Sequence, residues 1–234
     1  MTHYSGQIPI LVALDCIIFG FDGQNIKLLV IKRDFQPEKN KWSLMGGFLQ
    51  PDETLDDAAN RILKQLTGLE GVYMEQLHVF SELTRDPETR TLSVAYFALI
   101  DIHKYERQLN DLYHPEWFLL SKKPRLIFDH DDMVRLAQKQ LRYKAALHPL
   151  LFELLQDRFT IPQLQSLYEG VYETIFDNRN FTRKIMSTGL LVKLNGKDKS
   201  NSKKGAFYYK LDRKKYKIKK GAFLNLVSKA EKFI

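Results

Sequence analysis

Several basic side chains and aromatic rings lie near the predicted ends of strands around Gly46-Gly47, where they could bind a small ligand. Such groups beside a glycine-rich strand end are typical of a pocket for a polar small molecule. A structural role is the alternative for single members: Trp42 and Tyr96 could belong to the core, and Arg85 could pair with Asp86 across a turn. The candidate ligand-binding residues are Lys32, Arg33, Trp42, Phe48, Arg85, Arg90, Tyr96 and Asp129.

Three carboxylates near the same segment, those of Glu53, Asp56 and Asp57, could bind a divalent cation. Mg²⁺ needs several hard oxygen ligands, and Glu53 alone would hold it poorly. Asp56 and Asp57 stand in the first turn of a predicted helix, where acidic side chains compensate the helix dipole. We therefore expect Asp57 to pair with Arg61, four residues later, and we predict no metal site, no cofactor and no catalytic residue.

The uneven distribution of charge points to a second kind of partner. Residues 171–234 carry a formal charge of +12, whereas residues 1–170 carry −4. A strongly basic segment attracts polyanions, of which nucleic acid is the commonest. A solvated, disordered lysine-rich tail is the alternative, but the segment contains too many apolar side chains for it, and we predict an ordered basic domain. Those apolar residues are Phe207, Tyr208, Tyr209, Leu211, Tyr216, Ile218, Phe223, Leu224, Leu226 and Val227.

A predicted helix after Asp177 has an apolar face, with Phe181 and Ile185, and a polar face. Arginine and asparagine are the side chains that pair with guanine and adenine edges in the major groove of DNA, and lysines on the hairpin that follows would contact phosphates. An ordinary helical hairpin with a solvated face is the alternative. The predicted DNA-binding residues are Arg179, Asn180, Arg183, Lys184 and Ser187 on the helix and Lys197, Lys199, Lys203 and Lys204 on the hairpin.

The elements that must position the ligand-binding residues are mostly predicted strands. Thr54 and Asp57 approximate a capping box at the start of a helix, and Gly68 is a typical helix end. A second helix is predicted over residues 129–146, with acidic residues at its start. This part is therefore predicted to be an α+β or α/β sandwich. Its strands are expected at residues 8–19, 26–31, 42–48, 77–83 and 91–100.

The basic part is predicted to hold two helices and a hairpin. Residues 160–163 combine a threonine cap, an early proline and a glutamine, and apolar residues then follow at helical spacing as far as Ile175. The second helix begins at Asp177 or Asn178 and ends at Gly189. Strands are expected at residues 190–194 and 206–211, and residues 147–159 could form a connecting helix.

Composition sets the broad class of the protein. Apolar residues make up 44% and charged residues 27%, which is ordinary for a globular chain, and the single cysteine excludes a disulfide framework. The most apolar stretch, residues 8–21, is interrupted by Asp15 and is far shorter than the roughly 20 residues of a membrane helix. We expect a cytoplasmic protein that does not enter a membrane, with one domain at residues 1–150 and a second at residues 151–234.

The segment at residues 47–69 resembles the Nudix box, G-x5-E-x7-R-E-U-x-E-E-x-G-U, where U is an aliphatic residue. The resemblance covers about the first 145 residues and implies a Nudix-like α/β/α sandwich with a mixed sheet, within the α+β class. The predicted helices and turn over residues 160–187, with the basic hairpin after them, resemble a winged helix-turn-helix. The positions that match the box are Gly47, Glu53, Arg61, Leu63, Gly68 and Leu69.

The three helix glutamates of the box are replaced by Ile62, Gln65 and Leu66. These positions are related as i, i+3 and i+4, so they share one helix face. In the Nudix hydrolases that face holds Mg²⁺, which activates water beside a diphosphate. Because isoleucine, glutamine and leucine offer one weak neutral oxygen, we predict that the chain does not hydrolyse diphosphates.

The chain is similar, over nearly its whole length, to the Nudix-related transcriptional regulators. The segments that carry this similarity are residues 75–99 and 177–184. This resemblance implies a homodimeric repressor or activator that binds a double-stranded DNA operator and responds to a small sugar or sugar nucleotide in the front domain. Effectors in that family are ADP-ribose, for regulators of NAD metabolism, and pentoses such as L-arabinose, for regulators of carbohydrate use. The lost acidic face favours the pentose, although arginine and backbone amides could hold ADP-ribose without a cation.

Two other functions stay open. One is a Nudix hydrolase of nucleoside diphosphate derivatives with a basic appendage that binds nucleic acid. The other is an RNA-binding accessory protein without an effector. Release of AMP from ADP-ribose in the presence of Mg²⁺ or Mn²⁺ would identify the hydrolase.

Overall fold

The structure, a computed structural model, describes residues 6–147, 150–200 and 203–218. Its first part is a mixed sheet in the order β3-β2-β1-β6-β5, in which β4 also pairs with β1 and β7 with β2. The central pair β1 and β6 is parallel and the other pairs are antiparallel. The strands are β1 (Leu11–Phe21), β2 (Ile26–Lys32), β3 (Trp42–Ser43), β4 (Met45–Phe48), β5 (Glu75–Phe80), β6 (Thr91–Asp101) and β7 (Glu116–Leu119).

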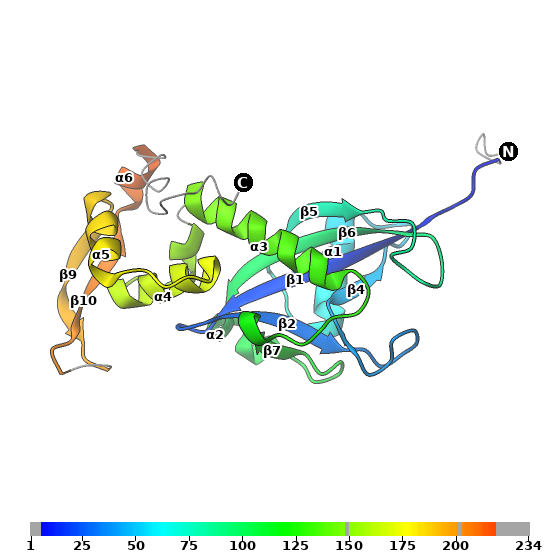
Figure 1. Ribbon diagram of the computed structural model, residues 1–234, viewed down its shortest axis with the longest axis horizontal. Coiled ribbons are helices and arrows are strands. Elements are labelled where there is room, and N and C mark those ends of the chain that lie inside the picture. The colour runs from blue at the N-terminus through cyan, green and yellow to red at the C-terminus, as the bar shows by residue number, and fades with distance from the viewer. Residues whose placement is uncertain (1–5, 148–149, 201–202, 219–234) are drawn as a thin grey trace.

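Helices cover both faces of this sheet, which gives the three layers of the predicted sandwich (Figure 1). On one face lies α1 (Leu55–Thr67), and on the other lies α3 (His130–Leu147). Alternate residues of β1 point to the two sides: Cys16 and Ile18 pack with α1, whereas Ile17 and Phe19 pack with α3. A strand buried on both faces has to be almost wholly apolar, as β1 is. The short helices are α2 (Ile102–Tyr105), η1 (Glu106–Gln108) and η2 (Leu120–Lys122).

The capping signals of the sequence operate as predicted. Thr54 caps α1 in a reciprocal capping box with Asp57, and Gly68 ends the helix in a left-handed conformation. Thr160 forms a second capping box with Gln163. Asp177, rather than Asn178, caps the next helix.

The second part is a winged helix-turn-helix. It contains η3 (Leu150–Leu154), β8 (Phe159–Thr160), α4 (Ile161–Tyr172), α5 (Asn178–Ser187), β9 (Leu191–Asp198), β10 (Ala206–Leu211) and α6 (Arg213–Ile218). Strands β8, β10 and β9 form a small antiparallel sheet in that order. The apolar residues Phe223, Leu224, Leu226 and Val227, which entered the prediction of an ordered basic domain, lie outside the described residues.

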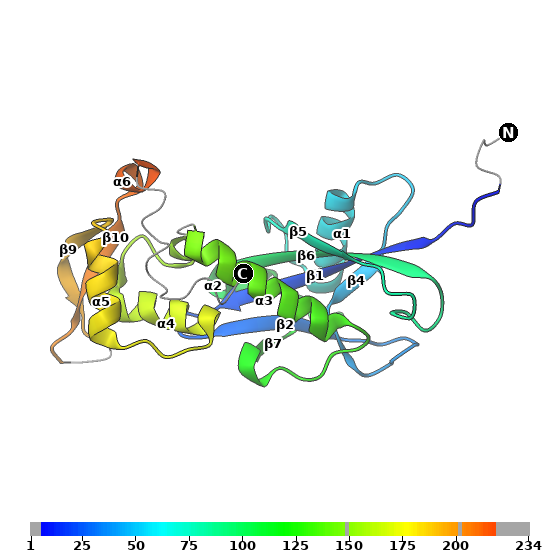
Figure 2. The same ribbon diagram turned by 45° about the horizontal axis from the view of Figure 1, so that its top comes forward.

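The two parts share a continuous core and are joined along α3. One apolar cluster runs from Phe19 on β1 through Val134 on α3 to Leu167 on α4. Gly170 of α4 lies against Ile26 at the start of β2, where a side chain would come within 2.9 Å of Cγ1 of that residue. Figure 2 shows α3 running from the sheet to the helices of the winged part.

Three predictions about elements were wrong. Residues 42–48 form two strands, because β3 pairs with β2 whereas β4 pairs with β1. Helix α4 stops at Tyr172 instead of reaching Ile175, because Glu173 takes a left-handed conformation. The segment before Phe159 contains the short 3₁₀ helix η3 in place of a connecting helix. Strands β7 and β8 are too short to give a periodic signal and were not predicted.

Among the described residues, no helix is both long and apolar enough to traverse a membrane.

Candidate functional site

A pocket of about 280 Å³ opens beside the Gly46-Gly47 segment of β4. Four of the predicted ligand-binding residues line it: Lys32, Arg33, Phe48 and Arg85. The other lining residues are Asp15, Ile31, Asp34, Phe35, Ser43, Leu44, Gly46, Gly47, Leu66, Asp86, Tyr113, Phe128 and His130. The sequence therefore predicted the location of the pocket and part of its wall.

The floor of the pocket contains a buried acid and a buried histidine that the sequence analysis missed. Asp15 accepts a hydrogen bond from the Ser93 hydroxyl at 2.6 Å, and Nε2 of His130 lies 3.4 Å from its other oxygen. The side chains of Asp15 and His130 are 6% and 4% exposed. A Cβ at Gly46 would stand 2.5 Å from Oδ1 of Asp15, so only glycine lets β4 pass this carboxylate.

The state of His130 follows from its hydrogen bonds. Its Nδ1 accepts from the backbone N–H of Leu44 at 3.1 Å, so in the neutral ring Nε2 carries the proton and faces Asp15. Burial lowers the pKa of His130, and this outweighs the nearby carboxylates of Asp15 and Asp129, which raise it. A neutral imidazole thus joins the start of α3 to the pocket floor.

Arg85 stands in the wall with its guanidinium fixed by carboxylates. It donates two hydrogen bonds of 2.9 Å to the oxygens of Asp129, and its Nη2 lies 3.7 Å from Asp15. Arg85 does not pair with Asp86, which was the alternative considered from the sequence. Asp129 thus acts on the pocket through Arg85, since it does not itself line the wall.

Aromatic rings lie beside Arg33, which lines the pocket together with Lys32 and Arg85. The guanidinium carbon of Arg33 lies 3.8 Å from the ring centroid of Phe35 and 5.8 Å from that of Phe128. Phe128 has a φ of 48°, a left-handed conformation that is rare for an aromatic residue and is often kept at binding sites. Phe35 and Phe48 are about half exposed. The mouth therefore offers a guanidinium and flat apolar surfaces to a ligand.

Three residues predicted to bind the ligand lie elsewhere. Trp42 packs edge-on against Phe118 in the core on the α3 side, because its ring points to the other face of the sheet. Tyr96 lies in the core on the α1 side and donates to Asp56 at 2.7 Å, which together with burial raises its pKa. Arg90 donates to the carbonyl oxygens of residues 81 and 82 in its own loop.

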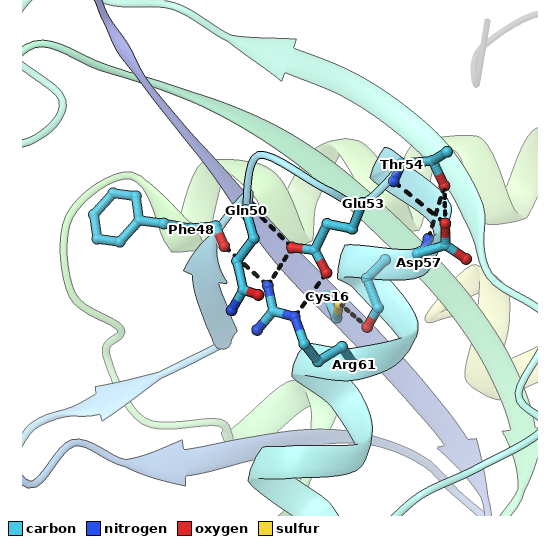
Figure 3. Close-up of polar contacts among 8 residues, drawn as sticks. Cys16, Phe48, Gln50, Glu53, Thr54, Asp57 and Arg61 are labelled. Atoms are coloured by element: carbon cyan, nitrogen blue, oxygen red, sulfur yellow. Dashed lines mark hydrogen bonds and ion pairs between the residues drawn. The ribbon is translucent and has the colours of Figure 1, made fainter.

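The residues of the box do not fit a Mg²⁺ ion. Ile62 is buried against Gly47, Gln65 points to solvent and Leu66 lines the pocket. The carboxylate of Glu53 accepts two hydrogen bonds from Arg61, at 2.8 and 2.5 Å, and one from the backbone N–H of Gln50 (Figure 3). Arg61 lowers the pKa of Glu53. Among the described residues there is also no cluster of three or more histidine, cysteine, aspartate or glutamate side chains that could hold a metal.

The predicted pairing of Asp57 with Arg61 was wrong. Asp57 instead bonds to the hydroxyl and backbone N–H of Thr54, because the capping box holds it at the helix start (Figure 3). Arg61 turns to Glu53 and to the carbonyl oxygen of Phe48, and so ties the loop before α1 to strand β4.

The basic part has an exposed helix face beside a lysine-rich hairpin. Phe181 and Ile185 are buried, as predicted, so α5 turns its polar side outward. Arg183 donates to the side-chain oxygen of Asn180 at 2.8 Å, and Ser187 donates to the carbonyl oxygen of Lys184. The exposed residues of this face are Arg179, Asn180, Arg183 and Ser187, with Lys184 partly exposed.

The hairpin holds cations at its base and near its tip. Lys197 and Lys199 stand on β9 and after it, and Lys203 and Lys204 precede β10. Nζ of Lys197 donates to the carbonyl oxygen of Lys204 at 3.3 Å. Lys193, which the sequence analysis did not single out, lies on the same hairpin.

Comparison with known proteins connects both regions to described domains. The model of the NUDIX domain matches residues 9–136. The model of the NrtR DNA-binding winged helix domain matches residues 151–211.

Two curated relatives differ in the activity that their names state. The ADPR responsive transcriptional repressor NtrR of Acinetobacter baylyi is 33% identical over 185 residues, which are 77% of this chain and 74% of that protein. The ADP-ribose pyrophosphatase of Methanocaldococcus jannaschii is 34% identical over 125 residues, 53% of this chain and 70% of that protein. The repressor is thus matched along both parts, and the enzyme along about half of this chain.

Among solved structures, NrtR of Shewanella oneidensis complexed with a 27mer DNA has a TM-score of 0.71 at 25% identity, covering 91% of this chain and 96% of that one. The NUDIX domain of the same protein complexed with ADP ribose has a TM-score of 0.53 at 27% identity. That match covers 59% of this chain and 92% of the other.

The neutral, buried state of His130 predicts a pH dependence of stability. An unfolded histidine has a pKa near 6.5, and the folded pKa of His130 lies below its ordinary value, so below about pH 6.5 the unfolded chain binds a proton that the folded chain does not. We expect His130 to reduce the free energy of unfolding by up to about 1.4 kcal/mol per pH unit as the pH falls below that value.

Urea unfolding between about pH 7 and about pH 5 measures this slope. His130→Asn, whose carbonyl can still accept from the Leu44 N–H, should flatten the curve, whereas substitution of the exposed His78 by asparagine should leave the slope as in wild type. Equal slopes for wild type and His130→Asn would show that His130 is not the group concerned.

Proposed function

This chain belongs to the NrtR family of Nudix-related transcriptional regulators, and we propose that it is a DNA-binding repressor whose affinity for its operator changes when ADP-ribose binds the pocket. The observation that carries the proposal is the position of α3, which has the pocket at its first residue and the winged helix-turn-helix near its last. The DNA complex of the Shewanella relative and the name of the Acinetobacter repressor support it.

The effector class follows from the mouth of the pocket. Arg33 donates through Nε to the carbonyl oxygen of Pro37, and its terminal nitrogens have no carboxylate hydrogen bond among the described residues. A guanidinium binds phosphate oxygens well, and the rings of Phe35, Phe48 and Phe128 offer surfaces on which a base can stack. A free pentose would leave these groups unused. We therefore prefer ADP-ribose to L-arabinose, which reverses the preference drawn from the sequence, and the ADP-ribose named for the relatives agrees with this choice.

Coupling between the two sites is proposed to run through α3. At its start, His130 bonds to Leu44 and faces Asp15, and Asp129 holds Arg85. Twelve residues later, Arg142 donates to the carbonyl oxygen of Val171 at 2.8 Å and pairs with Glu173. Its own carbonyl oxygen accepts from the Tyr172 hydroxyl at 2.9 Å. An effector that moves the start of this helix moves the contacts that hold the end of α4.

Three further points belong to the same proposal. The proposed boundary between the domains lies between residues 150 and 151, within η3. The active form is a homodimer that binds a pseudo-palindromic operator. The chain binds its effector without a metal ion and does not hydrolyse it, since the carboxylates of the box are replaced by Ile62, Gln65 and Leu66.

The second candidate function is hydrolysis of ADP-ribose, favoured by the similarity to the Methanocaldococcus pyrophosphatase. Calorimetric titration with ADP-ribose, together with a titration with L-arabinose and an assay for AMP, distinguishes the two candidates. We expect ADP-ribose to bind with the same dissociation constant in EDTA as in Mg²⁺, L-arabinose not to bind, and no AMP to appear.

Release of AMP that requires Mg²⁺ or Mn²⁺ and is abolished by Glu53→Gln would overturn the proposal that the pocket only senses ADP-ribose. It would support hydrolysis of ADP-ribose as the function. Binding of L-arabinose in place of ADP-ribose would keep the sensor and change its effector.

Removal of one recognition side chain tests the DNA site. Arg183→Ala should weaken binding by about 1–3 kcal/mol on a duplex that the intact chain selects from a random library, because Arg183 is exposed on α5. A fluorescence-anisotropy titration measures this, with the exposed Arg107→Ala as a control of equal charge. An equal loss on random DNA would indicate a phosphate contact, and an unchanged affinity on both duplexes would remove α5 from the interface.

Substitution at the end of α3 tests the coupling. Arg142→Ala should reduce the change in DNA affinity that saturating ADP-ribose produces, while the pocket still binds ADP-ribose with unchanged affinity. The control is Arg135→Ala, because Arg135 lies on the same helix with its side chain 70% exposed. A full effector response in Arg142→Ala would show that the coupling takes another route.

A further inference from the structure

The hairpin of the winged part contains an irregularity that brings two lysines together. Phe207 on β10 faces Lys197 on β9, and Tyr209 faces Lys193. One residue of β10, Tyr208, therefore stands opposite three residues of β9, those at positions 194–196, so that β9 contains a bulge. Gly196, with a φ of 106°, lies within the bulge and supplies a conformation that other residues rarely adopt.

The bulge changes which side chains can meet. In a regular strand, residues four apart are separated by about 13 Å, too far for both to reach one ring. Here Nζ of Lys193 lies 3.5 Å and Nζ of Lys197 lies 4.5 Å from the ring centroid of Phe207. Phe207 is 39% exposed and is not part of the buried core. Figure 1 shows this hairpin at the end of the molecule away from the sandwich.

Two ammonium groups on one ring repel each other, and the negative face of the ring offsets only part of this repulsion. An anion that binds both ammonium groups would offset the remaining repulsion between them. Carboxylates do not neutralise the pair, because neither lysine forms an ion pair with a carboxylate among the described residues. The arrangement suits one phosphate with its oxygens between two cations.

We propose that Lys193 and Lys197 form a phosphate clamp on the DNA backbone and that Phe207 is the positioning residue that holds both ammonium groups ready for it. The proposal rests on the DNA binding proposed above and adds to it the residues that hold the hairpin on the duplex. Lys193 joins the predicted contacts, and Phe207 acts without touching DNA by itself.

The clamp is tested by the salt dependence of binding to a labelled duplex of fixed arbitrary sequence, since phosphate contacts do not depend on sequence. The slope of log Kobs against log salt concentration should become shallower by about 0.9 when Lys193→Gln, Lys197→Gln or both replace the wild type, because one phosphate contact is lost. Phe207→Ala should weaken binding roughly fivefold, and Phe207→Tyr should restore it.

A double-mutant cycle separates positioning from folding. In the Lys193→Gln, Lys197→Gln background, Phe207→Ala should have no further effect on DNA binding. Lys210→Gln serves as the matched control, because Lys210 lies on β10 facing Val192, on the other side of the hairpin, and should leave the slope unchanged.

Three results would overturn the clamp: an unchanged salt slope in Lys193→Gln and Lys197→Gln, an effect of Lys210→Gln as large as theirs, or an effect of Phe207→Ala that persists undiminished without the lysines. Each of these requires that the intact chain binds the duplex. Failure of the intact chain to bind any duplex would instead refute the proposed DNA-binding function.

Discussion

The arrangement of this molecule depends on one unbroken helix that is anchored at both ends. Helix α3 begins on the buried pair of Asp15 and His130 and, near its last turn, exchanges hydrogen bonds with the end of α4. A helix rises 1.5 Å per residue and bends little, so the 12 residues from His130 to Arg142 act as a rod of roughly 18 Å. Because α3 also packs in the core under β1, we expect a displacement of one of its ends to move the other.

The helix of the box keeps its local structure without the three glutamates of the Nudix pattern. Arg61 still bonds to Glu53, and this pair fixes the loop before α1 whether or not an ion is present. Ile62 gains burial against Gly47 where a carboxylate would otherwise be desolvated. The pocket thereby becomes less acidic on the side of α1, which suits a ligand that carries its own negative charge. The proposed loss of hydrolysis and the proposed binding of an anionic effector would thus follow from the same substitutions.

Local signals in the sequence predicted the elements well, whereas contacts between distant residues could not be derived from it. Thr54, Gly68, Thr160 and Asp177 act on neighbours within a few residues, and the structure confirms each of them. Asp15 and His130 are separated by most of the front domain, and only the fold brings them together. An aspartate inside an apolar strand was the one available signal for this floor, since such a buried charge needs a partner.

The residues placed wrongly show the same limit in more detail. Trp42 and Tyr96 point to opposite faces of the sheet, Trp42 into the core on the α3 side and Tyr96 into the core on the α1 side, and a change of one residue in register exchanges the faces. The clamp on the hairpin depends on a bulge in β9, which no periodic pattern in the sequence predicts. In each case a local offset along a strand decides whether a side chain packs in the core or meets a ligand. A ligand that binds at such positions stabilises one arrangement only by the difference in its affinity for the alternatives. The effect of the pocket on the helix-turn-helix that we propose therefore cannot exceed this difference.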